Sequence, residues 1–127
     1  MRTILIILAA WHGAGGIFML AAPEAWYGFA PDVTETGPAN LHFIRDIGLA
    51  FIASAACLVA AARAEAPAAI LLAPAIFLGG HAGIHLVEIF VHGATAASAL
   101  RYSVLILLPG FLPLAFLKRR PLEGRTA

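Results

Sequence analysis

Charged residues are scarce in this chain. They make up 12% of its 127 residues, about half of the roughly 25% found in soluble domains. Eight lysines and arginines stand against seven aspartates and glutamates, so no strongly basic surface is available for nucleic acid. The composition therefore argues against an ordinary soluble domain, and we expect no nucleic-acid partner.

Cysteine is almost absent as well. The single Cys57 allows neither an internal disulfide nor a metal cage built from cysteines. A glycine-rich phosphate loop, the HExxH motif of zinc proteases and the CxxCH motif of covalent haem attachment are all missing from the sequence. These absences argue against a phosphate loop for nucleotides, a zinc protease and a covalently attached haem.

Four long apolar runs occupy most of the chain. They cover residues 3–22, 41–62, 68–91 and 97–117, and each is close to the ~20 residues that a helix needs to cross a bilayer. The mean hydropathy of the whole chain is +0.91. We therefore predict an all-α integral membrane four-helix bundle, a single membrane domain over residues 1–127 that lies in a lipid bilayer.

The charged residues predict how this bundle is oriented. If the four spans alternate in direction, the basic residues fall on one side and the acidic residues of the first connection fall on the other. The basic set is Arg2, Arg63, Lys118, Arg119, Arg120 and Arg125; the acidic set is Glu24, Asp32 and Glu35. Basic residues mark the cytoplasmic face, so we expect both termini in the cytoplasm and a bacterial inner membrane location.

One stretch of the third run combines apolar and ionisable residues. Residues 79–92 read GGHAGIHLVEIFVH. At about 100° per residue, its ionisable residues fall within an arc of about 60° on one face of a helix; they are His81, His85, Glu88 and His92. Ionisable groups inside a membrane usually face a bundle interior or a wet cavity. We therefore expect this face to be the functional centre.

A second polar group opens the second run. His42, Arg45 and Asp46 lie within its first turns, and we expect Arg45 to pair with Glu88 of the third span. His42 and Asp46 share a face that continues with small residues, namely Ala53, Ala56 and Ala60. Only His12 of the first span lies deeper than these polar groups. The alternating topology brings the others into the outer half, so we expect a site that faces the periplasm.

Metal binding is the first chemistry that these residues suggest. Histidine and carboxylate ligands suit Cu, Fe or Zn. His81 and His85 are one helical turn apart, Glu88 adds an oxygen ligand, and Asp46 or His42 would complete the shell. His92 lies about 16 Å from His81 along the helix axis, so it requires a second site or a place at the mouth of the first.

A redox cofactor is the second possibility. The head group of a quinone needs a donor such as histidine or arginine, and His42 and Arg45 would supply it, with Trp11, Phe43 and Phe90 lining a slot for the tail. A His–Glu ladder would carry protons outward. A non-covalent haem held by His12 and His85 is a variant of this hypothesis.

A structural role is the third possibility. Small four-span proteins can serve as accessory subunits of a larger membrane complex, and the polar face would then be a network of hydrogen bonds between helices. Four short spans also fit a transporter, although only as a homo-oligomer. The residues identify no reaction under any of these alternatives.

The layout resembles one known family. Small size, four spans and the motif Arg-Asp-Ile-Gly-Leu at Arg45–Leu49 are similar to DoxX-like membrane proteins. This resemblance covers the span layout and the short motif, and it implies a four-span fold with a link to quinone-coupled redox complexes. The face formed by His81, His85, Glu88 and His92 is not part of the resemblance.

Overall fold

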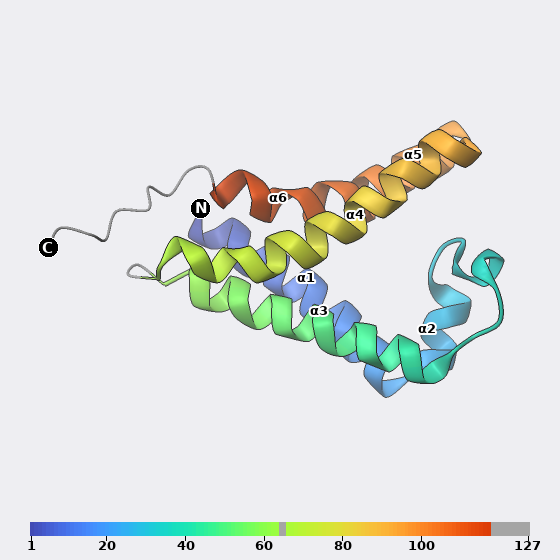
Figure 1. Ribbon diagram of the computed structural model, residues 1–127. Helices are drawn as coiled ribbons and strands as arrows, with labels where there is room; N and C mark the ends of the chain where they lie inside the picture. Colours follow the sequence, from blue (N-terminus) through green and yellow to red (C-terminus); the bar gives the residue numbers. More distant parts are fainter. Residues whose placement is uncertain (64–65, 118–127) are drawn as a thin grey trace, which may run out of the picture.

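The computed structural model describes residues 1–63 and 66–117, and these fold into helices joined by short connections, without a strand (Figure 1). The elements are α1 (Arg2–Ala21), α2 (Pro23–Phe29), η1 (Val33–Thr36), α3 (Leu41–Ala61), η2 (Ala68–Leu71), α4 (Leu72–His92), α5 (Ala96–Tyr102), the π-helix η3 (Ser103–Leu107) and α6 (Leu108–Leu117).

Four of these helical stretches are long and apolar enough to cross a membrane. They are Arg2–Ala21, Leu41–Ala61, Ala68–His92 and Ala96–Leu117. The predicted all-α architecture with four apolar helices is confirmed, and it is consistent with an integral membrane protein. The basic residues Lys118, Arg119, Arg120 and Arg125 lie outside the described residues.

The helices form two hairpins. α1 packs along α3, and α4 packs along α6 and η3. Figure 1 shows the hairpins together at the end that holds the N-terminus and spread apart toward α2 and α5. In the first hairpin, a Cβ added to Gly48 would lie 2.9 Å from the carbonyl oxygen of Gly16 and 2.8 Å from the Cβ of Met19. Glycine therefore permits the close approach of these two backbones.

The second hairpin depends on proline as well as glycine. A Cβ added to Gly110 would lie 2.8 Å from the carbonyl oxygen of Leu78, so α4 and α6 also approach closely. Pro109 lacks the N–H that would pair with a carbonyl one turn earlier, and the wider π-helix η3 lies just before it. The fourth span therefore contains a π-helix within a continuous helical stretch.

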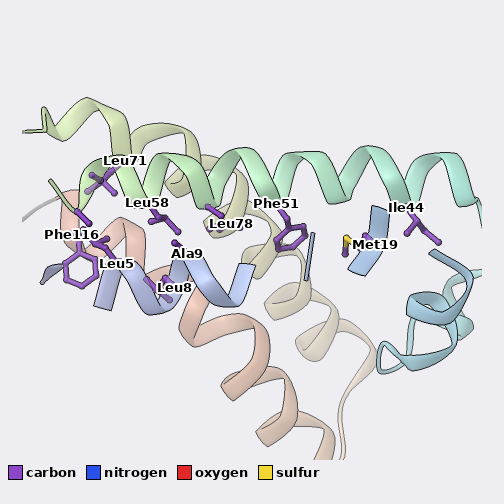
Figure 2. Packing of buried hydrophobic residues seen from close by; sticks show 13 residues of the cluster. Leu5, Leu8, Ala9, Met19, Ile44, Phe51, Leu58, Leu71, Leu78 and Phe116 are labelled. Atoms are coloured by element: carbon purple, nitrogen blue, oxygen red, sulfur yellow. The ribbon is translucent and has the colours of Figure 1, made fainter. Parts of the chain in front are cut away.

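The apolar core lies in the half of the bundle near the N-terminus. Figure 2 shows Leu5, Leu58, Leu71 and Phe116 gathered from all four long helices, whereas Met19 and Ile44 lie toward the other end. Leu5, Leu58 and Leu71 are completely buried. Burial of each such side chain in water is worth about 1.5–3 kcal/mol.

The connection between the first two spans contains more structure than its turn-rich sequence suggests. Pro23 occupies the first turn of α2, with Glu24 beside it, and both residues favour a helix start. The hydroxyl of Tyr27 donates to the carbonyl of Gly37, which draws the following segment back on α2. Asp32 adopts a left-handed conformation at φ 62°, which aspartate tolerates better than most residues.

Candidate functional site

The histidines of α4 lie side by side, as their spacing predicts. The ring centroids of His81 and His85 are 4.7 Å apart, edge to face. Glu88 follows one turn later, with a carboxylate oxygen 3.2 Å from Nδ1 of His85. That nitrogen is buried, and the contact lacks the alignment of a hydrogen bond. His92 is the exposed last residue of α4 and does not join the other three.

Aromatic rings from other helices extend this pair in both directions. Phe51 of α3 meets His81 edge-on with centroids 5.6 Å apart, and Figure 2 places Phe51 halfway along α3. At the other end, Tyr102 of α5 stacks on His85 at 5.3 Å. The result is a chain of rings, which we call the imidazole ladder: Phe51, His81, His85 and Tyr102.

The outer end of the ladder is tied to the first connection. The Tyr102 hydroxyl donates to Oδ2 of Asp32 at 2.8 Å, and the Arg101 guanidinium donates to both carboxylate oxygens at 2.7 and 3.0 Å. The hydrogen bond from Tyr102 lowers the pKa of the Asp32 carboxyl, and Arg101 lowers that pKa further. We call these three residues the outer clasp, and it joins the two hairpins where they spread apart.

His12 lies beyond the inner end of the ladder. It is only 5% exposed, and its ring stacks on Phe51 at 5.6 Å. Its Nε2 lies 3.5 Å from the carbonyl oxygen of Pro109 in α6. Pro113 has no N–H to offer that carbonyl, since it lies four residues later. His12 therefore has a structural partner that explains why a histidine is buried at this depth.

The polar residues of α3 do not reach the ladder. His42 pairs with Asp46 of the same helix at 3.4 Å, and its side chain is 89% exposed. Among the described residues, no ion pair joins Arg45 to Glu88, and the Glu88 carboxylate lies beside His85 of its own helix. Arg45 instead lines a hollow at the corner of α1 and α2, together with Glu24. The sequence predicts that these residues lie level with the outer half of α4. In the structure they are exposed and lie away from the face of α3 that meets α4.

The geometry of the described residues can be compared with what a metal ion and a haem each require. Within residues 1–63 and 66–117, no three His, Cys, Asp or Glu side chains lie close enough to hold a metal ion. A haem between His12 and His85 would have to displace Phe51, which packs against His12 and His81. Neither a metal nor a haem gains support from this arrangement.

The rings next to the imidazoles are not those that the sequence suggests for a slot. Trp11, Phe43 and Phe90 are 50%, 59% and 80% exposed and lie on outward faces. Phe51 and Phe77 flank His81 instead. Tyr102 and Asp32 are further residues that sequence reasoning left out of the site. The signal in the sequence that points to the outer clasp is a pair of opposite charges, Arg101 near the start of the fourth run and Asp32 in the acidic first connection.

Comparison with known proteins adds no family to this description. No family model, no curated protein and no solved structure matches the chain. The resemblance to DoxX-like proteins accordingly remains an expectation from the span layout and the motif at Arg45–Leu49.

Proposed function

We propose that this chain is an integral protein of a bacterial inner membrane with both termini in the cytoplasm. The four apolar helices and the basic residues at positions 2, 63 and 118–120 support this orientation. The end of the bundle that holds α2, α5 and the outer clasp then faces the periplasm. In this setting the imidazole ladder lies in the outer half of the membrane.

The ladder binds the head group of a quinone or quinol. The observation that carries this proposal is the His85–Glu88 contact of 3.2 Å within a row of aromatic rings. The Glu88 carboxylate lies beside Nδ1 of His85, so Nε2 is the ring nitrogen without this neighbour. In the tautomer that carries its proton on Nδ1, Nε2 of His85 is a hydrogen-bond acceptor, which suits the hydroxyl of a quinol.

The neighbouring rings fit the same kind of ligand. Tyr102 stacks on His85, and Phe77 stacks on His81, so flat apolar surfaces flank both imidazoles. Offset stacking on such surfaces favours a planar ring by about 0.5–1.5 kcal/mol. An isoprenoid tail needs no protein slot, because lipid surrounds the helices and is as apolar as the tail.

The experiment is an inventory of what the protein carries. The chain is purified in mild detergent, its lipids are extracted and analysed by mass spectrometry, and metals and the visible spectrum are measured on the same sample. We expect a quinone at about one molecule per chain and its loss in His85→Leu. Stoichiometric Cu, Fe or Zn, or the Soret band of haem, would contradict the proposal and replace the quinone by that cofactor.

A further inference from the structure

A sharp corner joins α1 to α2 at the end of the first hairpin. α1 ends at Ala21 and α2 begins at Pro23, so Ala22 alone makes the turn, with a non-helical φ of −143°. Proline has no N–H and hinders the helical conformation of the residue before it, so α1 does not continue through this point. The chain therefore changes direction within one residue, and α2 comes to lie beside the start of α3 (Figure 1).

The corner leaves a hollow that its small residues do not fill. The volume of this hollow is about 340 Å³, within the range of about 300–1,000 Å³ found for small-molecule sites. Alanines and Pro23 of the corner, together with Leu41 of the first turn of α3, form its apolar walls. Its charged residues are Glu24 from α2 and Arg45 from α3. Two opposite charges therefore share one hollow with apolar walls.

Within residues 1–63 and 66–117, neither of these two charges has an ion-pair partner. The ion pairs of the described residues join other side chains, and Glu24 and Arg45 do not pair with each other across the hollow. Both residues are exposed, so a ligand can reach them. Ionisable groups at a membrane helix usually meet a partner. A ligand that carries both signs of charge would pair with both residues at once.

The position of the hollow indicates what that ligand is. The hollow lies between the end of the first apolar helix, Arg2–Ala21, and the start of the second, Leu41–Ala61. In a bilayer this is the boundary between hydrocarbon and head groups. Trp26 and Tyr27 of α2 are of the residue types enriched at that boundary. The molecules that surround the hollow are therefore phospholipids, whose head groups lie at this depth.

We propose that the hollow binds the head group of a phosphatidylethanolamine molecule from the outer leaflet. The Arg45 guanidinium presents paired N–H donors to the phosphate oxygens, and the primary ammonium of the lipid donates to the Glu24 carboxylate. Phosphatidylglycerol has no ammonium for Glu24, and the quaternary ammonium of phosphatidylcholine has no N–H to donate. The inference rests on the proposed crossing of a membrane, but it does not depend on the quinol site.

Lipid titration of the purified protein, followed by native mass spectrometry, tests the head-group site. The chain in mild detergent is titrated with phosphatidylethanolamine, phosphatidylglycerol or phosphatidylcholine of identical acyl chains, and with soluble glycerophosphoethanolamine. We expect one phosphatidylethanolamine per chain at saturation, bound about fivefold more tightly than the other two lipids. We expect no saturable binding of the soluble head group, because only a lipid is concentrated beside the hollow by its tails.

Two exchanges of a charged side chain for glutamine separate the roles of the two residues. Arg45→Gln should weaken the binding of phosphatidylethanolamine about fivefold, because the phosphate loses a charged donor. Glu24→Gln should remove the preference for phosphatidylethanolamine over phosphatidylglycerol. The matched control is Asp46→Asn, which changes the exposed residue next to Arg45 on α3 but outside the hollow, and it should leave both affinities unchanged.

Several outcomes would overturn the proposal. Absence of saturable phosphatidylethanolamine binding would do so, as would equal affinity for all three lipids or an unchanged affinity in Arg45→Gln. A soluble head group that binds as tightly as the lipid would assign the hollow to a soluble ligand instead. Washing native membranes with alkaline carbonate tests insertion separately. A chain released by the wash would contradict the membrane proposal and this site with it, whereas a chain that is retained but binds no lipid would contradict the head-group site alone.

Discussion

Nε2 of His12 lies 3.5 Å from the carbonyl oxygen of Pro109, the carbonyl that Pro113 leaves without a helical partner. His12 is only 5% exposed, so water has little access to replace the missing N–H. The histidine of α1 and the proline of α6 therefore form one structural unit. This contact ties the first hairpin to the second near the middle of the bundle, close to the inner end of the imidazole ladder.

A double-mutant cycle tests this unit. His12→Phe removes the donor and should lower the free energy of unfolding by about 1 kcal/mol, the usual size of a hydrogen bond between membrane helices. In a Pro113→Ala background the alanine N–H pairs with the Pro109 carbonyl, so the same change should cost less. Reversible unfolding in mixed detergent micelles measures both costs, and equal costs would show that the two residues are not coupled.

The close contact between α1 and α3 predicts an asymmetry among the glycines. Gly48→Ala directs a methyl group at the Gly16 carbonyl oxygen, 2.9 Å from the added Cβ, and should cost about 1–3 kcal/mol. Gly15→Ala is the matched control, since no atom lies within 4 Å of its added Cβ. Unfolding measurements on both variants should separate them clearly, and equal stabilities would contradict the described helix contact.

The outer clasp predicts a dependence of stability on pH. The pKa of Asp32 is lowered from its ordinary 3.8, first by the Tyr102 hydroxyl and then by Arg101. As the pH falls, the unfolded chain binds a proton before the folded chain does. The clasp therefore contributes fully above the ordinary pKa, and its contribution disappears as the pH falls through the lowered value.

Thermal unfolding in detergent between about pH 7 and about pH 3 measures this contribution. Asp32→Asn should be less stable than the natural chain near neutral pH, and the difference between the two should shrink at the acidic end. Glu35→Gln, which changes an exposed carboxylate of the same connection, is the control. A difference between Asp32→Asn and the natural chain that stays constant with pH would contradict the role of the ionised carboxylate.

The sequence predicts the helices better than the contacts between them. Apolar runs of about 20 residues place the four long helices within a few residues of their bounds. Helical spacing likewise brings His81 and His85 together, because both lie on one helix. These predictions need only local geometry, which the residues of a single segment determine.

The contacts of α3 show why the rest of the site was missed. Depth in the membrane places His42, Arg45 and Asp46 level with α4, but depth does not tell which face of α3 meets that helix. The Gly16–Gly48 contact directs Phe51 inward and His42 outward. Likewise, Asp32 and Tyr102 are 70 positions apart in the chain, and they meet because the first connection folds back toward α5.

Titration of the purified protein with a short-tailed benzoquinol tests the proposed ligand site most directly. The natural chain, His85→Leu and His92→Leu are compared, since His92 is on the same helix but apart from the ladder. We predict saturable binding of one molecule per chain, weakened at least tenfold in His85→Leu, which is about 1.4 kcal/mol, and unchanged in His92→Leu. No saturable binding to the natural chain, or equal affinity in all three proteins, would contradict a quinol site at the imidazole ladder.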